Sequence, residues 1–418
     1  MKPLSAFLLL LLAAGSARAQ SPAPLYLNLG SHNEIRDSAD QGLHYISDSA
    51  DYNAIRALSL EIADTVFAHG ARWNAMYDSN FIRACLHHEN GAVNANDLIQ
   101  YLDALPEAEV DPHNHFDTNT FSANYNPYNY PDLAHLLDSC GLPAPRTNMG
   151  GFIWRNFPPN VNEDWSAYQT PQPGNVYPNY SWQPVVLWGG GSPGHINDFR
   201  SFGVWKPAAP TQMLFGQHAP ANFLTCIGNG CSEGFLLTDT STVAWMISQV
   251  ESLLYFISQQ PPDPNAFWTA TIMMNHKHFQ SANYVAKLGQ LLGGLDAYTQ
   301  SGQIVWATTS EKHAAWLGQH SNPNDFFNHP CSGIPLETQE LAETRAEIFP
   351  NPSSTQIEIH FPGEGSMRLF DLAGRCLLNE PFSTTARLDV SVLPAGIYQL
   401  AVETGAQRST RKIIVRKE

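Results

Sequence analysis

Two histidines separated by a single residue, His113 and His115, are the side chains in this sequence best suited to hold a metal ion. They follow a strand-like run that begins at Glu109. Side chains along a strand alternate with a period of two, so both imidazoles are expected on one side of the backbone. Two neutral ring nitrogens at a strand end can bind one divalent ion, with zinc expected. Asp111 and Asp117 flank the pair and could add an oxygen ligand or orient a histidine.

A His-x-His pair alone is more often an exposed pair without a role, so the elements that position it matter. Apolar strand-like runs alternate with amphipathic helical segments from Leu25 to about Ser310. This alternation predicts an α/β fold with a parallel sheet, and its length predicts a (β/α) barrel over residues 20–333. The expected strands are 25–29, 71–76, 109–113, 184–188, 202–205, 270–275 and 304–307. The expected helices are 51–69, 94–105, 132–140, 242–259 and 282–298.

In such barrels the chemistry lies just past the carboxyl ends of the strands. This rule selects His32 and Glu34 after the first strand and His276 after a late strand, together with the pair near residue 113. The alternative is that the first two belong to a strand-end hydrogen-bond network and that His276 is a partly exposed loop imidazole.

Aromatic residues crowd a Pro- and Asn-rich stretch between residues 125 and 188. Long irregular segments in compact domains are often binding loops, and aromatic faces stack on sugar rings. Most of these aromatics would serve only to keep the loop folded. The expected substrate-binding residues are those at or near predicted strand ends, namely Trp154, Trp188, Trp205, Lys206 and Asp117.

The first nineteen residues have the pattern of a secretion signal. Lys2 supplies a positive charge, residues 4–14 form an apolar run, and Ala17-Arg18-Ala19 forms a small-residue cleavage site. The apolar run is too short to cross a bilayer, and no later stretch is long and uncharged enough. We therefore expect an exported protein without a transmembrane segment, whose mature chain starts near Gln20.

Composition narrows the class of partner. The chain has 418 residues, which favours one large and one small domain, and a net charge of −16 at pH 7. The acidic excess falls in the region expected to form the barrel. It argues against nucleic acid or an anionic polymer as a partner and favours neutral or amino-bearing substrates.

Two smaller motifs bear on a disulfide and on a serine nucleophile: the first is accepted and the second is rejected. Cys226 and Cys231 enclose a Gly-Asn-Gly turn, so a disulfide between them is expected in an exported chain. Residues 190–194 fit the Gly-x-Ser-x-Gly pattern of serine hydrolases. In that pattern the residue after the serine must donate its backbone N–H, which Pro193 lacks. A nucleophile at Ser192 is therefore excluded.

The pattern changes after Gly333. Residues 334–346 read as a polar linker, and residues 347–418 as short alternating strands of a small all-β sandwich. Its motifs are Phe-Pro-Asn-Pro at 349–352, Asp-Leu-Ala-Gly-Arg at 371–375, Leu-Pro-Ala-Gly-Ile-Tyr at 393–398 and a basic tail. This segment resembles the type A carboxy-terminal sorting domain of the type IX secretion system of Bacteroidetes. The resemblance implies export across the outer membrane by the type IX machinery, then release or surface attachment. An ordinary sandwich that binds carbohydrate or protein is the alternative.

Residues 25–316 resemble the polysaccharide deacetylase superfamily, whose fold is a (β/α) barrel of the deacetylase and glycoside hydrolase type. The matching segments are Ser31–Glu34, Asp111–His115, Gly203–Pro207 and Ile272–His276. Three features depart from the family pattern. The first segment has no adjacent aspartates, the histidines are two rather than four apart, and Lys206 stands where the family has arginine, which makes a planar two-point contact.

The resemblance implies roles for individual residues. His113, His115 and His32 would hold a divalent metal, with zinc expected, which polarises an amide carbonyl and acidifies bound water. Glu34 would take the proton from that water, and His276 would protonate the departing amine.

The expected function is that of an exported metal-dependent hydrolase that removes acetyl groups from an N- or O-acetylated carbohydrate. One alternative is a glycoside hydrolase, with its two carboxylates drawn from Glu34, Asp117, Glu163 and Asp164. The other is a surface carbohydrate-binding protein without catalysis. Metal content separates the hydrolase from the binding protein, and released acetate or new reducing ends separate the two enzymes.

Overall fold

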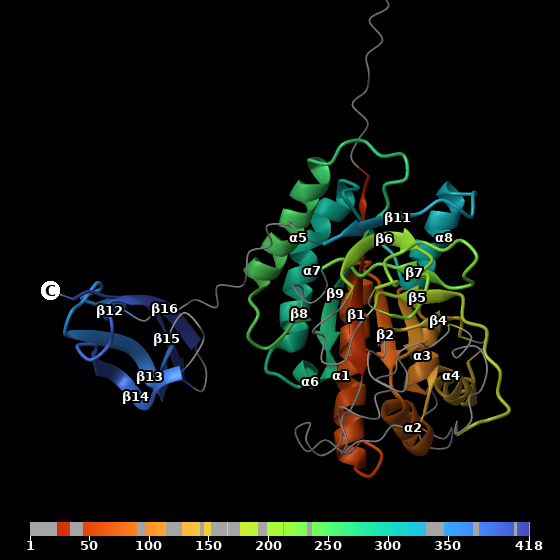
Figure 1. Ribbon diagram of the computed structural model, residues 1–418. Coiled ribbons are helices and arrows are strands. Elements are labelled where there is room, and N and C mark those ends of the chain that lie inside the picture. Colours follow the sequence, from red (N-terminus) through yellow and green to blue (C-terminus); the bar gives the residue numbers. More distant parts are fainter. Residues whose placement is uncertain are drawn as a thin grey trace, which may run out of the picture. The chain divides into compact units, whose positions relative to one another are not determined.

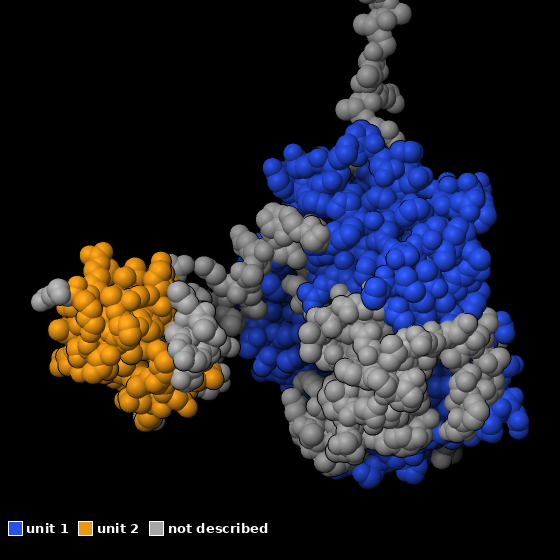
Figure 2. Space-filling model, viewed as in Figure 1, with its two compact units in different colours: residues 1–336 blue, residues 337–418 orange. Residues whose placement is uncertain are grey.

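The chain divides into two compact units, residues 1–336 and residues 337–418 (Figure 1, Figure 2). The computed structural model describes residues 23–33, 45–89, 97–113, 128–142, 146–151, 165, 176–190, 199–211, 213–231, 236–331, 347–370, 376–404 and 408–417. Each unit has its own apolar core, and the first unit carries all the residues for which chemistry is expected.

The first unit is built on a six-stranded sheet in which every pair of strands is parallel. The strand order is β3-β2-β1-β9-β8, and β10 pairs with the first residues of β1. Parallel strands bring their carboxyl ends to one edge, so residues that follow β1, β3 and β9 meet there. The strands are β1 (Leu25–Asn33), β2 (Trp73–Tyr77), β3 (Ala108–Pro112), β8 (Leu236–Leu237), β9 (Trp268–Asn275) and β10 (Ile304–Trp306).

A second, five-stranded sheet has the order β11-β6-β7-β5-β4. Its strands are β4 (Asn148–Met149), β5 (Val186–Trp188), β6 (Ser201–Trp205), β7 (Thr225–Ile227) and β11 (Phe327–Pro330). β4, β5 and β7 are parallel, whereas β6 runs antiparallel to both β7 and β11. Among the described residues, backbone hydrogen bonds from Gly150 N–H to Pro112 O (2.8 Å) and from Thr271 N–H to Asn229 O (3.2 Å) join the two sheets.

The strands of the first sheet are buried on both faces, as expected for a parallel sheet covered by helices. Leu25, Leu27 and Leu29 of β1 belong to the main apolar core, which also contains buried residues of α1, α5 and α7. Asn28 and His32 alternate with these leucines and lie on the opposite, inner face of the strand. The outer face therefore anchors the helices, and the inner face carries polar groups.

Eight helices lie among the described residues (Figure 1). The helix α8 begins with a capping box, in which the Thr308 side chain and the Glu311 side chain each accept a hydrogen bond from the other residue's backbone N–H. The helices are α1 (Ser49–Ala68), α2 (Ser79–His88), α3 (Leu98–Asp103), α4 (Tyr130–Ser139), α5 (Val243–Ser258), α6 (His276–Phe279), α7 (Tyr284–Gln300) and α8 (Thr309–Gln319).

The second unit is a five-stranded antiparallel sheet with the order β12-β13-β15-β16, in which β14 also pairs with β13. Its strands are β12 (Glu347–Phe349), β13 (Gln356–Phe370), β14 (Cys376–Asp389), β15 (Gly396–Thr404) and β16 (Arg408–Val415). The pairing of β13 with β14 shifts register between His360 and Glu364. Such irregularities bend a strand, which allows one sheet to enclose a core that includes Ile359, Leu369 and Leu400.

The predicted α/β class with a parallel sheet is confirmed, as is the all-β class of the carboxy-terminal segment. Every predicted strand and helix of the first unit overlaps an element of the structure, within a few residues at each end for the described part. Among the described residues, however, strand pairing gives two sheets rather than one closed ring, so the barrel stays a prediction. The described strands of the second unit pair as a single sheet rather than as the two packed sheets of the predicted sandwich.

Candidate functional site

Three histidines gather at the carboxyl ends of the parallel strands: His32 near the end of β1, His113 directly after β3, and His276 directly after β9. We call them the histidine cluster. The rings of His32 and His113 stack with centroids 3.8 Å apart and an interplanar angle of 19°. All three residues are buried, with exposed fractions of 9%, 1% and 1%. The structure thus brings together three of the residues selected by the strand-end rule.

Backbone carbonyls orient two of these rings. Nδ1 of His113 lies 2.7 Å from the carbonyl oxygen of Gly150, and Nδ1 of His276 lies 3.1 Å from that of His32. A carbonyl oxygen can only accept a hydrogen bond, so each Nδ1 must be the donor. In a neutral ring the lone pair is then on Nε2, and this atom is buried in all three histidines. This tautomer, fixed by a carbonyl, is the one that metal-binding histidines commonly have.

Two consecutive glycines, Gly150 and Gly151, bring the backbone against the cluster. A Cβ atom at Gly151 would lie 2.9 Å from Nδ1 of His113 and 3.4 Å from Nε2 of His32. Gly151 also has a φ of +99°, which side chains rarely tolerate. A Cβ atom at Gly150 would lie 2.8–2.9 Å from Met76, Asp111 and Pro112. We predicted no role for this segment, although a Gly-Gly step after a buried strand is a visible signal of close backbone approach.

Trp188 forms an apolar wall beside the cluster. Its ring meets that of His32 edge to face, with centroids 5.5 Å apart, and it packs with Met76 and Met273. The indole N–H donates to the hydroxyl of Thr271 at 2.9 Å, and the residue is only 5% exposed. Of the expected substrate-binding residues, this one lies at the histidines, and it is held in place by its hydrogen bond.

Four of the predicted site residues lie outside the described part of the chain: Glu34, His115, Asp117 and Trp154. Their roles as base, metal ligand and substrate-binding residues stay predictions.

Trp205 and Lys206 lie at the other end of the strands. β6 is antiparallel to β7, so its last residues neighbour the amino ends of β5 and β7. Trp205 is 1% exposed, and its indole N–H donates to the carbonyl oxygen of Phe215 at 2.7 Å. The structure therefore does not bring these two residues to the histidine cluster, contrary to the arrangement that the resemblance implies.

A buried polar network fills the inner faces of the strands below the histidines. Asn28 donates to Asn74 and Asn74 donates to Asp111, both at 2.8 Å. The Thr271 hydroxyl and the ammonium group of Lys312 donate to Oδ1 of the Asn28 side chain, at 2.8 Å and 2.6 Å. Burial raises the pKa of Asp111 and lowers that of Lys312. This network could not be predicted from local patterns because its members come from several separate elements.

The predicted disulfide between Cys226 and Cys231 is wrong. Cys231 is bonded to Cys331, across a Cα–Cα distance of 5.7 Å, and Cys226 is a buried free thiol. Cys226 lies within β7 and packs into an apolar cluster with Leu187 and Leu224. A strand thus occupies the place where the sequence suggested the start of a small closed loop. The bond instead joins the segment after β7 to the residue that follows β11.

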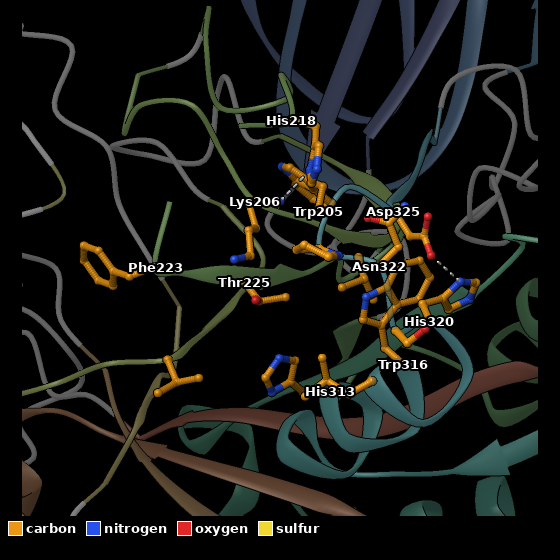
Figure 3. Close-up of a pocket in the computed structure, with 15 residues that line it drawn as sticks. Trp205, Lys206, His218, Phe223, Thr225, His313, Trp316, His320, Asn322 and Asp325 are labelled. Atoms are coloured by element: carbon orange, nitrogen blue, oxygen red, sulfur yellow. Dashed lines mark hydrogen bonds and ion pairs between the residues drawn. The ribbon is translucent and has the colours of Figure 1, made fainter. Parts of the chain in front are cut away.

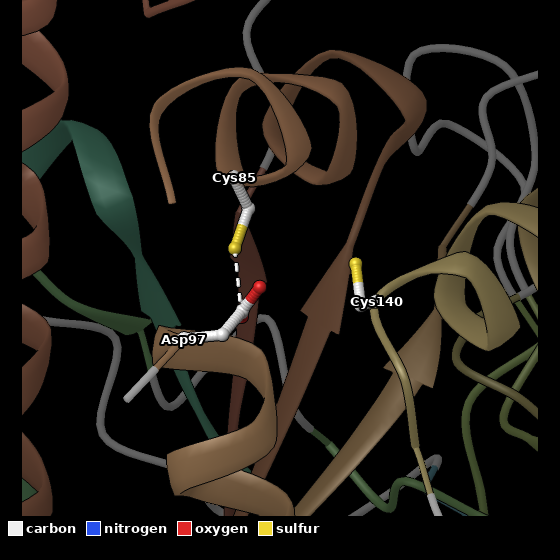
Figure 4. A group of neighbouring side chains, drawn as sticks. All are labelled: Cys85, Asp97 and Cys140. Atoms are coloured by element: carbon white, nitrogen blue, oxygen red, sulfur yellow. Dashed lines mark hydrogen bonds between the residues drawn. The ribbon is translucent and has the colours of Figure 1, made fainter. Parts of the chain in front are cut away.

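A second group of possible metal ligands involves Cys85 of α2, Asp97 and Cys140 (Figure 4). One potential ligand atom of each lies within 4.8 Å of the others. The Cys85 thiol donates to Asp97 Oδ1 at 3.0 Å, and the same oxygen accepts the backbone N–H of Ile99 as the cap of α3. The carboxylate is thus already used to start a helix, and the neighbouring Cys140 together with burial raises the pKa of the Cys85 thiol.

Comparisons with known proteins give one specific result and one remote one. A search of curated proteins finds no match. Among solved structures, the 4-alpha-glucanotransferase from Thermococcus litoralis is similar with a TM-score of 0.38 and 11% sequence identity. That match covers 71% of this chain and 40% of the transferase, so the chain spans less than half of its length. A likeness this remote assigns neither a fold nor a function.

The specific result concerns the second unit. Residues 347–416 match the family of secretion system C-terminal sorting domains. Among the described residues, no helix is both long and apolar enough to cross a membrane. The matched family implies an interaction with the type IX secretion machinery. Residues 347–416 are therefore a sorting domain of this secretion system, and the chain is exported to the cell surface or beyond.

Proposed function

We propose that the first unit is a metal-dependent hydrolase that removes acetyl groups from an acetylated carbohydrate outside the cell. The observation that carries the proposal is the histidine cluster itself. Its imidazoles lie at the carboxyl ends of three parallel strands of one sheet, and carbonyls orient two of them with the lone pair on the buried Nε2.

The imidazoles of the histidine cluster are of the chemical type that suits a zinc ion. His32 and His113 would hold it, and His115 or a carboxylate from the segments after β1 and β3 would complete its ligands. Imidazole nitrogen is a preferred zinc ligand, and the hydrogen bond from His113 Nδ1 to Gly150 is the outer contact that zinc-binding histidines usually make. When bound, the ion would polarise the substrate carbonyl and lower the pKa of a water molecule.

His276 is suited to move a proton beside this ion. Its Nδ1 donates to the backbone carbonyl of His32, so the ring keeps a fixed position relative to β1. Its Nε2 would accept a proton from solvent and deliver it to the leaving group. The general base is proposed to be Glu34, which follows β1 by one residue.

The substrate class has a separate basis. The sequence motifs resemble those of polysaccharide deacetylases, and Trp188 supplies a rigid aromatic wall next to His32. Aromatic walls of this kind suit the apolar faces of sugar rings. Export also places the first unit where polysaccharides are accessible.

The first test is the metal content of the purified mature secreted chain. The wild type should retain about one equivalent of zinc or another divalent metal after dialysis, and the His32→Ala and His113→Ala variants should lose it. His87→Ala is the control, because His87 is an exposed histidine in α2. A folded wild type that takes up no metal after incubation with candidate ions would contradict the proposal.

The second test is product analysis with acetylated chitooligosaccharides and acetylated xylan. Release of acetate without new reducing ends supports the deacetylase, whereas new reducing ends would indicate a glycoside hydrolase. The His276→Gln variant should keep its metal and lose at least about 100-fold in turnover, because it lacks the proton donor. Unchanged turnover would remove His276 from the mechanism.

A further inference from the structure

A cavity of about 300 Å³ lies at the end of the strands opposite the histidine cluster (Figure 3). Its lining includes Val185 directly before β5, Thr225 at the start of β7, and Lys206 directly after the antiparallel β6. The helix α8 contributes His313 and Trp316. We call this space the Lys206 cavity. It is formed entirely by described residues and shares none with the histidine cluster.

One side of the cavity carries a positive charge that no carboxylate neutralises in the described part of the chain. The Lys206 ammonium group donates to the neutral carbonyl oxygen of Pro220, at 3.3 Å. In Figure 3 the Lys206 side chain extends towards Thr225 and His313. Burial and the Lys206 charge both lower the pKa values of His218 and His313, so these rings are neutral near pH 7. The side therefore has one positive charge and several neutral polar groups.

His218 adds a hydrogen-bond donor to the same wall. Its Nδ1 accepts the backbone N–H of Lys206 at 3.1 Å, so in the neutral ring the proton must be on Nε2. That Nε2 is buried and has no hydrogen-bond acceptor among the described residues. Buried donors usually have a partner, so a ligand acceptor at this wall would satisfy it. An acceptor with negative charge would also satisfy Lys206.

The other side of the cavity offers an aromatic surface and acceptors. Trp316 stacks on His320 with ring centroids 3.7 Å apart, which holds the indole in place. Asn322 and Asp325 lie on this side in Figure 3, and Asp325 is 3.8 Å from Nδ1 of His320. An amide and a carboxylate are suitable acceptors for hydroxyl groups, and an indole suits the apolar face of a sugar ring.

We propose that the Lys206 cavity binds a single sugar acid, with its carboxylate at Lys206 and its hydroxyl groups towards Asn322 and Asp325. The volume is at the lower end of the range for small-molecule sites, which suits one monosaccharide and excludes a long oligosaccharide. The chain as a whole is acidic, with a net charge of −16, so anions are repelled elsewhere and Lys206 gives this cavity its selectivity. The site is independent of the proposed hydrolase reaction.

Calorimetric titration of the mature secreted chain with glucuronate and with glucose tests this proposal. Glucuronate should bind, and glucose should bind at least about tenfold more weakly because it lacks the charged partner for Lys206. The Lys206→Met variant should lose this preference, while Lys287→Met should keep it. Lys287 is the matched control because its ammonium group also donates to backbone carbonyls, those of Thr238 and Asp239 in another part of the unit.

Two further measurements distinguish a sugar-acid site from a general anion site and from the histidine cluster. Asn322→Ala should lower the affinities for glucuronate and for glucose by the same factor, since this exposed side chain is proposed to face the hydroxyl groups that both sugars carry. His113→Ala should leave glucuronate binding unchanged, which keeps the result apart from the fate of the hydrolase proposal. Absence of binding to a folded wild type, equal affinity for both sugars, or inorganic phosphate binding as tightly as glucuronate would each overturn the proposal.

Discussion

The two ends of the parallel strands carry polar groups that are used in different ways. At the amino ends, Lys312 is fully buried and its ammonium group donates to Asn28 and to the carbonyl oxygen of Ala270, at 2.6 Å and 2.8 Å. At the carboxyl ends, His113 and His276 use Nδ1 to donate to backbone carbonyls and carry a lone pair on a buried Nε2. Asn28, which accepts from Lys312, and His32, whose carbonyl accepts from His276, both lie on the inner face of β1.

This difference separates polar groups that stabilise the fold from the polar groups that we propose bind a metal ion. A buried network whose members bond to one another contributes rigidity, and breaking it leaves groups without partners. In a metal-binding histidine, by contrast, one ring nitrogen fixes the orientation through its hydrogen bond and the other nitrogen supplies the lone pair that binds the ion. Changes at the lower network should therefore alter stability without altering metal binding, and changes at the cluster should do the reverse.

The largest effect on stability is expected from Cys331→Ala. Loss of the bond to Cys231, which closes a segment with a sequence separation of 100, should lower the free energy of unfolding by about 2–5 kcal/mol. Metal content of the folded protein should not change. Guanidinium unfolding without reductant measures the effect. Cys226→Ala is the control, and its free energy of unfolding should fall by only about 1 kcal/mol. A non-reduced peptide linking Cys226 to Cys231 would contradict the observed pairing.

Gly151→Ala should act on both stability and the cluster. The new Cβ would press on His113 and His32, and the backbone there has a φ of +99°. We therefore expect the free energy of unfolding to fall by about 2–3 kcal/mol and metal affinity to fall roughly 10–100-fold. Gly70→Ala is the matched control, because its φ is +60° and no atom lies within 4 Å of the added Cβ. It should cost about 1 kcal/mol and leave metal affinity intact. Equal metal affinity in both variants would show that the glycine does not shape the cluster.

Lys312→Met should lower the free energy of unfolding by about 1–3 kcal/mol near neutral or higher pH, since Asn28 and Ala270 lose a donor. The metal content that we propose for the histidine cluster should be the same in this variant as in the wild type. Lys287→Met serves as the control for removing a less buried lysine from the same unit.

The stability contributed by Lys312 should also depend on pH. Burial lowers the folded-state pKa of this lysine below its ordinary value of 10.5. Between the two pKa values the unfolded chain binds more protons than the folded one, so wild-type stability should rise with pH in that window. The difference between wild type and Lys312→Met should therefore grow with pH up to about 10.5 and shrink towards the folded pKa. Denaturant unfolding across that range measures it, and parallel curves would contradict the assignment.

The smallest effect is expected from Trp188→Phe. The variant removes the hydrogen bond from the indole to Thr271 and keeps an aromatic ring beside His32, so a loss of about 1 kcal/mol is expected. Trp205→Phe removes a similar bond, to Phe215, at the opposite end of the strands. Both should lose similar stability, but only Trp188→Phe should raise KM for the acetylated substrate. A rise in KM for both would mean that the two ends are not separate.

The strands and the grouping of three histidines at their ends could be predicted because that information is local in the sequence. The alternation in β1 distinguishes the leucines of the outer face from Asn28 and His32 of the inner face, and a parallel sheet then brings His32, His113 and His276 to one edge. Side-chain alternation with a period of two is a property of each strand by itself, so the two faces of a strand can be predicted without knowing which strands pair with it.

The wrong or missing predictions concern features that depend on contacts between segments far apart in the sequence. A strand pattern has no direction, so nothing in residues 202–205 showed that β6 runs antiparallel and carries Lys206 to the amino ends of β5 and β7. The bond between Cys231 and Cys331 joins residues far apart in sequence, which local turn signals cannot reveal. Lys312 reaches the strands only because α8 begins at Thr309, and that helix was not predicted.

The sorting domain has its own core, and every buried apolar residue of that core comes from residues 357–415. Cutting the chain between the units would therefore remove none of the residues of that core. The sorting signal and the apolar core that supports it therefore lie in the same segment of the chain. We expect residues 337–418, fused behind an unrelated folded enzyme with a signal peptide, to carry that enzyme out of a cell that has the type IX machinery.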